Sequence, residues 1–225
     1  MGEAIGQTLP FAVAVALSPV PIIAIVLILG TPRARTNGLA FLLGWVFGLA
    51  AVGTVVLLAT SGTDTTEDDG PAAWVSWVKL ALGVLMLLIA GRSWRGRPRE
   101  GQPATMPGWM AALDTFTAPK SAGTAILLSA VNPKNLVLTL GAAAAIVETG
   151  IPAGEEFVAL AVFVLVGALG IAVPVVIYVF MGARADELLS GLKEWLGEHN
   201  AAIMAAVCLV IGAKLIGDAI SGLAG

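Results

Sequence analysis

The chain has 225 residues and a formal net charge of -3, with 58% hydrophobic and only 12% charged residues. A soluble domain carries about 25% charged residues, and the mean hydropathy of +0.93 also indicates a membrane protein. The single cysteine, Cys208, excludes an internal disulfide and a dithiol relay, and one cysteine with one histidine gives no structural zinc site. We expect no nucleic-acid partner.

Six apolar segments are long enough to cross a bilayer, since about 20 helical residues span the hydrocarbon core. In chain order they lie at about 4–30, 37–60, 72–92, 121–147, 155–181 and 200–222. The sequence therefore predicts an all-α integral membrane protein with six transmembrane helices. It divides into an N-terminal three-helix repeat (1–92), a cytoplasmic linker (93–120) and a C-terminal three-helix repeat (121–225).

Basic residues are concentrated in the odd-numbered connectors between these segments. They are Arg33 and Arg35 in the first connector, Arg92, Arg95, Arg97, Arg99 and Lys120 in the third, and Arg184 and Lys193 in the fifth. Short loops rich in Lys and Arg face the cytoplasm. We therefore expect both termini to lie outside.

Proline-containing motifs interrupt the first and fourth apolar segments. They are Ser18-Pro19-Val20-Pro21 and Asn132-Pro133-Lys134-Asn135, and their first prolines are 114 positions apart. Because each half of the chain holds an odd number of helices, the halves would insert with opposite topology. The sequence predicts two inverted-topology repeats in which helices 1 and 4 are broken at prolines.

The proline breaks are the predicted substrate site. Proline cannot donate to the carbonyl four residues earlier, so the half-helix after each break presents an electropositive N-terminus suited to an anion. Lys134 would lie ~20 Å from either end of its helix, where a lysine costs about 2.5–3.5 kcal/mol without a partner or cavity. The candidate substrate-binding residues are Lys134, Asn132, Pro133, Asn135, Ser18, Pro19 and Pro21. Taken singly, Pro19, Pro21 and Pro174 are better explained as packing kinks.

Four further charged residues are candidates for a path or gate. Lys79 and Lys214 lie near the outer ends of their helices, within snorkelling range. Lys214 can pair with Asp218 one turn later, either as a structural pair or, with Lys79, to guide an anionic head group. Asp114 belongs to a predicted amphipathic interfacial segment at 106–116, as a surface charge or as a gate or proton-handling group.

Glycine pairs predict close helix packing. Gly44 and Gly48 fall in the second predicted helix, and Gly167 and Gly170 fall in the fifth. Small residues at such spacing let helix backbones approach closely. The same faces would permit a homodimer.

Together these motifs resemble the lysine exporter (LysE) superfamily: six helices, a proline-bearing first helix, Asn132-Pro133-Lys134, and glycines at Gly83 and Gly212. Segments 16–23, 109–117 and 132–136 resemble its actinobacterial glycolipid-addressing (GAP) or sulfolipid-addressing (Sap) branch. The resemblance implies export of a cell-envelope lipid or its precursor, and hence a bacterial plasma membrane. Amino-acid exporters typically carry Gly-Pro where this chain has Ser18-Pro19, which speaks against amino-acid export.

The sequence leaves two functions open. The first is an exporter or flippase that moves an anionic envelope lipid, a lipid precursor or a small anion by alternating access around a midplane site. The second is a non-transporting scaffold for a lipid-export machine, and a LysE-type exporter of small solutes is a further alternative. We expect no enzyme activity, no catalytic residue and no cofactor, and the chain has no Walker-type loop for ATP hydrolysis. Metal export is disfavoured, because hard cations need several carboxylates, and Asp218 is the one acid that we place inside a helix, with Glu155 and Glu156 at the outer surface.

Overall fold

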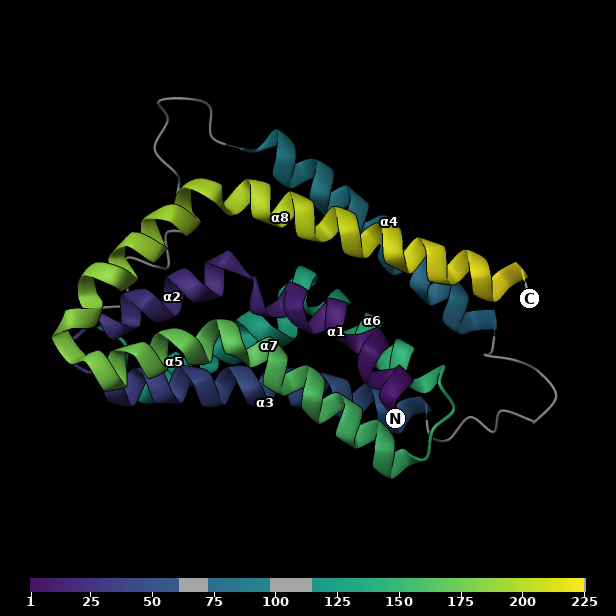
Figure 1. Ribbon diagram of the computed structural model, residues 1–225, viewed down its shortest axis with the longest axis horizontal. Helices are drawn as coiled ribbons and strands as arrows, with labels where there is room; N and C mark the ends of the chain where they lie inside the picture. The colour runs from purple at the N-terminus through teal and green to yellow at the C-terminus, as the bar shows by residue number, and fades with distance from the viewer. Residues whose placement is uncertain (61–72, 98–114, 225) are drawn as a thin grey trace.

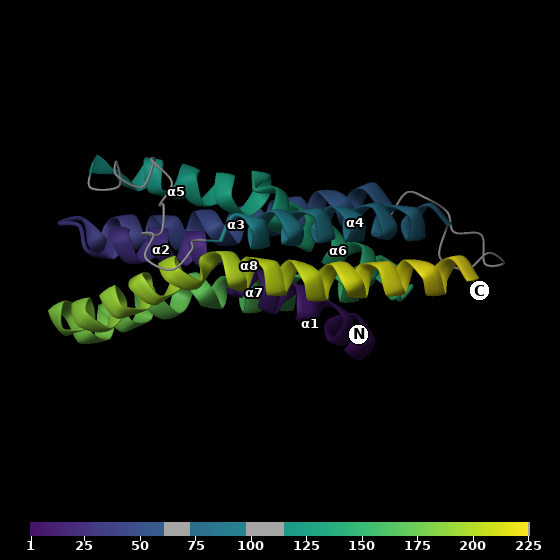
Figure 2. The same ribbon diagram turned by 90° about the horizontal axis from the view of Figure 1, so that it is seen from above.

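The computed structural model describes residues 1–60, 73–97 and 115–224, and the regular structure in these ranges is entirely helical. The first half contains α1 (Gly2–Ala16), α2 (Pro19–Leu29), α3 (Ala34–Thr60) and α4 (Ala73–Arg95). The second half contains α5 (Ala118–Ile126), the π-helical turn η2 (Leu127–Val131), α6 (Pro133–Val147), α7 (Ala153–Met181), the 3-10 turn η3 (Gly182–Arg184) and α8 (Ala185–Ala224). Figures 1 and 2 show these helices lying along the long axis of an elongated bundle.

Four of these helices, α3, α4, α7 and α8, are each long and apolar enough to cross a membrane. Two further spans arise if each bent pair is one span: α1 with α2, bent by 51°, and α5–η2 with α6, bent by 61°. The chain is therefore a multi-pass membrane protein by the length and composition of its helices. The two bends fall at the predicted prolines, because Pro19 and Pro133 are each the first residue of the helix that follows.

Glycines allow the closest helix contacts, as the sequence predicted. A Cβ atom on Gly48 of α3 would lie 2.0 Å from the hydroxyl oxygen of Ser129 in η2. On Gly170 of α7 it would lie 2.0 Å from the carbonyl oxygen of Ala16 in α1. Since heavy atoms cannot approach so closely, any larger residue at these positions would push the helices apart.

The most extensive contact between two elements joins α4 and α8. Their glycines meet reciprocally: a Cβ on Gly83 would lie 3.0 Å from the carbonyl oxygen of Gly212, and a Cβ on Gly212 would lie 3.0 Å from that of Gly83. The backbones of α4 and α8 therefore approach closely where these two glycines meet. Figure 1 shows the two helices crossing along one side of the bundle.

The last helix differs from its prediction. We expected a connector ending near residue 199, but α8 is continuous over 40 residues, or about 60 Å. Its first part is amphipathic: Leu189 and Leu196 are buried in the core, while Glu194 between them is exposed and Lys193 is half-buried. Lys193 therefore lies in a helix, and His199 lies within α8 with its exposed ring stacked on Trp195. Burial of one leucine-bearing face outweighs the charges that suggested a loop.

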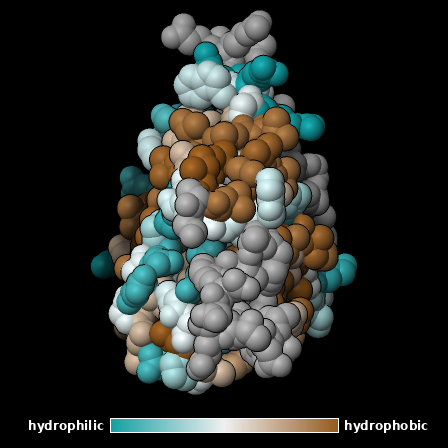
Figure 3. Space-filling model, turned by 90° about the vertical axis from the view of Figure 1, so that its right-hand side faces the viewer, coloured by the Kyte–Doolittle hydropathy of each residue, from teal (hydrophilic) through white to brown (hydrophobic). Residues whose placement is uncertain are grey.

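Apolar side chains also cover much of the outer surface. Figure 3 shows a broad hydrophobic area bordered by hydrophilic residues. The exposed large side chains include Leu43, Phe47, Val55, Leu88, Leu165, Val210 and Phe180. A water-facing surface rarely carries contiguous apolar patches of this kind, whereas a lipid-facing surface does.

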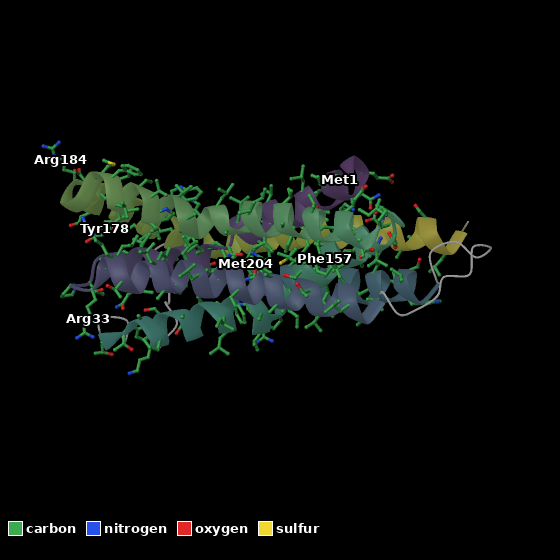
Figure 4. The ribbon with its side chains drawn as sticks, turned by 90° about the horizontal axis from the view of Figure 1, so that it is seen from below. Met1, Arg33, Phe157, Tyr178, Arg184 and Met204 are labelled. Atoms are coloured by element: carbon green, nitrogen blue, oxygen red, sulfur yellow. The ribbon has the colours of Figure 1, made fainter. Side chains whose placement is uncertain are left out.

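The two ends of the bundle differ in charge. Figure 4 shows Arg33 and Arg184 at one end, with Met1 toward the other. The amino group of Met1 pairs with Glu155 at the start of α7, 3.1 Å away. The basic first and fifth connectors thus share one end, as the predicted alternation of helix directions requires. Asp114 and most of the predicted interfacial segment lie outside the described residues.

Candidate functional site

The break between α1 and α2 frees a backbone carbonyl that Lys134 then binds. In a continuous helix the N–H of Ser18 would donate to the carbonyl of Ala14, but here it donates to Val15 at 3.1 Å. Pro19 has no N–H to contribute. The Lys134 Nζ donates to the released Ala14 carbonyl at 3.0 Å. A side chain of the second half thus caps the broken helix of the first.

The second break is built around the π-helical turn η2, which was not predicted from the sequence. The N–H of Asn132 donates to the Leu127 carbonyl, five residues back, at 3.1 Å. This shift removes the α-helical partner of the Leu128 carbonyl, and the Asn135 side-chain amide donates to it at 2.8 Å. Such single-turn π-helices often occur at functional sites.

The two caps occupy corresponding positions. Ala14 and Leu128 are separated by the same 114 positions as Pro19 and Pro133. In each half, therefore, the carbonyl five residues before the proline accepts a hydrogen bond from an α6 side chain. Lys134 serves the first half and Asn135 serves the second.

One hydrogen-bonded cluster joins the starts of α2 and α6. Lys134 Nζ donates to the Ser18 hydroxyl at 2.6 Å, and that hydroxyl donates to the Asn135 Oδ1 at 3.1 Å. The Asn132 side chain caps α6 by accepting from the backbone N–H of Lys134 at 3.1 Å. We call these four residues, Ser18, Asn132, Lys134 and Asn135, the break cluster. The structure brings them together, as expected from two converging half-helix N-termini.

The electrostatics of the break cluster favour an anion. Lys134 is only 3% exposed, and among the described residues no carboxylate lies within ion-pairing distance of it. Its hydrogen-bond partners are neutral oxygens, and the buried thiol of Cys208 on α8 lies within electrostatic range. The half-helix N-termini add positive potential. A buried cation without a counter-charge is costly, so an anionic ligand would be stabilised here.

The prolines of the predicted site shape the backbone and supply no hydrogen-bond donors. Pro19 and Pro21 are buried in the first turn of α2, where a missing N–H is tolerated. Pro133 opens α6 and is exposed. Pro174 lies inside α7, which continues through it. The binding groups of the site are therefore the polar members of the break cluster.

The expectation that Lys79 snorkels to the surface is wrong. Its side chain is only 2% exposed and forms an ion pair with Glu148, the residue that caps the end of α6. The Lys79 side chain stays inside the bundle because a carboxylate at the end of a neighbouring helix pairs with its ammonium there. Glu148 was not among the candidate residues predicted from the sequence. Its position directly after an apolar helix, at the same predicted end as Lys79, is the signal that could have revealed it.

The predicted pair of Lys214 and Asp218 is confirmed. Their charged atoms lie 2.5 Å apart on successive turns of α8, with both side chains about one third exposed or less. The Lys214 ammonium also lies 5.2 Å from the ring centroid of Phe11 on α1. Neither Lys79 nor Lys214 contacts the break cluster through a described hydrogen bond, so any role in a path remains a prediction.

Comparison with known proteins identifies one family. The family model described as Sap, sulfolipid-1-addressing protein, matches residues 8–221. No curated protein and no solved structure matches the chain. The matched range contains both proline breaks and the whole break cluster, together with the α4–α8 crossing. The chain therefore belongs to the Sap, sulfolipid-1-addressing protein family.

Proposed function

We propose that this protein is a transporter, an exporter or flippase, that moves an anionic cell-envelope lipid or its precursor across a bacterial plasma membrane. The description of its family, sulfolipid-1-addressing protein, names a lipid and supports a lipid-related role in the membrane. A sulfolipid carries an acidic head group. The break cluster offers the matching charge in the interior of a membrane protein.

The observation that carries the proposal is the uncompensated ammonium of Lys134. A lysine buried within a membrane bundle marks a functional site by default. Among the described residues it has only neutral hydrogen-bond partners, and these occupy two of its three donors. An acidic head group could accept from the third donor and supply the missing negative charge. The resulting charge-assisted hydrogen bond would be stronger than the neutral ones it joins.

Recurring contacts between the two halves support an inverted repeat of the LysE type. The contact of α1 with α7 corresponds to that of α5 with α3, and the contact of α2 with α8 corresponds to that of α6 with α4. Gly48 packs against Ser129, and Gly167 packs against Val15. The two residues that face the glycines, Val15 and Ser129, are again 114 positions apart. Two equivalent halves around a central site can rock between an outward-open and an inward-open state. We propose alternating access on this basis.

The charge asymmetry of the bundle supports an orientation. Arg33 and Arg184 share the end that we assign to the cytoplasm by the positive-inside rule. Met1 and Glu155 mark the opposite end, which we assign to the outside. In this orientation a lipid captured from the inner leaflet would leave on the side of the termini.

One observation favours the second candidate, a non-transporting scaffold for a lipid-export machine. Lys134 caps Ala14 and binds Ser18, so its hydrogen bonds already have a purely structural use. A scaffold would need the charge only to hold α1 and α6 together. The test must therefore separate the charge of Lys134 from its hydrogen bonds.

The variant Lys134→Gln removes the charge and keeps a neutral hydrogen-bond donor, whose amide nitrogen lies one bond nearer the backbone than the ammonium. We expect it to abolish movement of a sulfated glycolipid with a fluorescent acyl chain between the leaflets of proteoliposomes. The readout is the fraction of probe reached by a membrane-impermeant quencher. Lys120→Met, which removes an exposed lysine of α5, should retain wild-type activity.

Helical content and elution volume should be the same in Lys134→Gln and wild type. Wild-type lipid movement by Lys134→Gln would refute the charge-based mechanism. If wild-type protein moves no probe at all while remaining folded, the scaffold becomes the better assignment.

A further inference from the structure

An apolar groove runs between α1 and α8, close to the break cluster. It has a volume of about 500 Å3, which falls within the range of about 300–1,000 Å3 typical of ligand pockets. Its lining residues are Gly6, Leu9, Pro10, Val13 and Ala14 on α1, Leu17 directly after α1, and Ala206, Val207, Val210 and Ile211 on α8. Not one of these residues is charged.

The groove opens toward the outside of the bundle and has a closed floor. Leu9, Val13 and Val210 on its walls are well exposed, whereas Ala14 and Ile211 are buried. A groove of this kind in a membrane protein faces the lipid acyl chains directly. It is accessible from the bilayer without passage through either aqueous face.

The floor of the groove lies against the charged site. Ala14 lines the groove, and its carbonyl accepts the hydrogen bond from the Lys134 ammonium. From Gly6 to Leu17 the lining follows α1 for about 16 Å, roughly half the thickness of the hydrocarbon core. Along α1 the groove therefore extends for about the thickness of one leaflet and passes the carbonyl that binds the ammonium.

We propose that this groove holds an acyl chain of the transported lipid while its anionic head group binds Lys134. The inference rests on the proposed transport function and narrows its substrate class to amphiphiles that carry at least one long chain. A small soluble anion would use the ammonium but leave the groove empty. The uncharged lining of the groove suits the acyl chain of an acidic lipid, and the Lys134 ammonium suits its head group.

The groove keeps the acyl chain in apolar surroundings and adds little hydrophobic binding free energy. Bilayer chains are as apolar as leucine, so a chain gains little free energy by moving from lipid into the groove. The groove instead lets the chain stay in apolar surroundings while the head group enters the bundle. Among the helix pairs in contact, α1 and α8 share some of the fewest contacts, so their separation would break few interactions.

A second apolar cavity lacks this relation to the charged site. It has a volume of about 270 Å3 and lies between α3, α4 and α6. Its lining consists of Val55, Val56, Ala59, Val75, Val78, Leu140, Ala144 and Val147. No member of the break cluster lines it, so the position of Ala14 singles out the α1–α8 groove.

Filling the groove tests the inference. Ala206→Phe places a ring on one wall at an exposed position, and Ala81→Phe places the same ring on the exposed face of α4. In proteoliposomes with the tail-fluorescent sulfated glycolipid, we expect Ala206→Phe to lower the rate about tenfold or more, equivalent to about 1.4 kcal/mol. Ala81→Phe should keep the wild-type rate.

The outcomes separate the groove from the function as a whole. Wild-type movement by Ala206→Phe, together with loss in Lys134→Gln, would overturn the groove and leave the proposed transporter intact. Wild-type movement by Lys134→Gln would instead refute the proposed function. Measurable and equal binding of galactose 3-sulfate, the soluble head group alone, to Ala206→Phe and wild type would support the groove as the chain site.

Photolabelling gives a readout that does not depend on transport. A sulfated glycolipid with a diazirine midway along its chain should label residues 6–17 and 206–211 in wild-type protein, and this preference should be lost in Lys134→Gln. The same lipid without its sulfate serves as the control. Equal labelling by both lipids, or labelling spread evenly over all lipid-facing helices, would mean that only bulk lipid contacts the groove and would overturn the inference.

Discussion

At the scale of single residues, the broken helices depend on side chains that replace backbone hydrogen bonds. Lys134 and Asn135 are neighbours at the start of α6, yet they cap carbonyls in different halves of the protein. A buried carbonyl without a partner is costly, and lipid offers no water to replace it. The polar residues of the break cluster therefore support the fold as well as the proposed anion site.

Asn135→Leu tests the structural part of this role. The substitution leaves the Leu128 carbonyl without its donor and the Ser18 hydroxyl without its acceptor. We expect the free energy of unfolding in mixed micelles to fall by about 1–3 kcal/mol. Gln7→Leu, which removes an exposed hydrogen bond to Glu3, should change it by less than about 0.5 kcal/mol. Equal stability of Asn135→Leu and wild type would show that the caps are dispensable.

At the scale of helices, glycines and one buried ion pair hold the elements in register. Gly48 and Gly170 bring α3 and α7 into backbone contact with the broken helices. The Lys79–Glu148 pair ties α4 to the end of α6. Because α6 starts at the break cluster and ends at this pair, its position is constrained at both ends. Movement of α6 during transport would have to strain or release one of these attachments.

A double-mutant cycle measures the α4–α6 attachment. Lys79→Met leaves Glu148 without its partner and should lower the free energy of unfolding by about 3–5 kcal/mol, whereas the double variant Lys79→Met with Glu148→Leu should recover most of this loss. Lys214→Met breaks the more exposed pair with Asp218 and should cost less than about 1 kcal/mol. Additive effects of the two α4–α6 substitutions would mean that the pair contributes no coupling energy.

At the scale of the whole molecule, the Lys134 ammonium is buried, and an apolar groove lies beside the Ala14 carbonyl that it binds. This arrangement corresponds to an occluded state of the proposed transport cycle. In the proposed inverted repeat, the outward-open and inward-open states would be related by the exchange of the two halves. The direction of transport then depends on which end faces the cytoplasm.

Single cysteines test the orientation of the bundle. With Cys208→Ser as background, which removes the chain's one cysteine, new cysteines are placed at Gly154 beside the start of α7 and at Arg184 between α7 and α8. In intact bacterial cells we expect a membrane-impermeant thiol reagent to label Gly154→Cys and to leave Arg184→Cys unlabelled until the membrane is opened. The reverse pattern would place the termini in the cytoplasm.

The sequence alone determined the properties that depend on local composition and spacing. Apolar length indicated the membrane class, because a hydrocarbon core imposes a minimum helix length. Pro19 and Pro133 located both bends, because a proline cannot continue the hydrogen-bonding of a helix wherever it packs. The basic connectors predicted which ends of the helices lie together. The paired glycines predicted that α3 and α7 pack closely against neighbouring helices.

Only the tertiary structure decided which side chains meet. Helices that are apolar on all sides, such as α2, carry no pattern that sets their rotation about the helix axis. The pairing of Lys79 with Glu148, the capping of Ala14 by Lys134 and the groove between α1 and α8 all depend on that rotation. The start of α8 is likewise helical because burial of Leu189 and Leu196 outweighs the local charges. Contacts between distant residues are set by how whole helices pack, and a linear pattern of hydropathy does not contain that information.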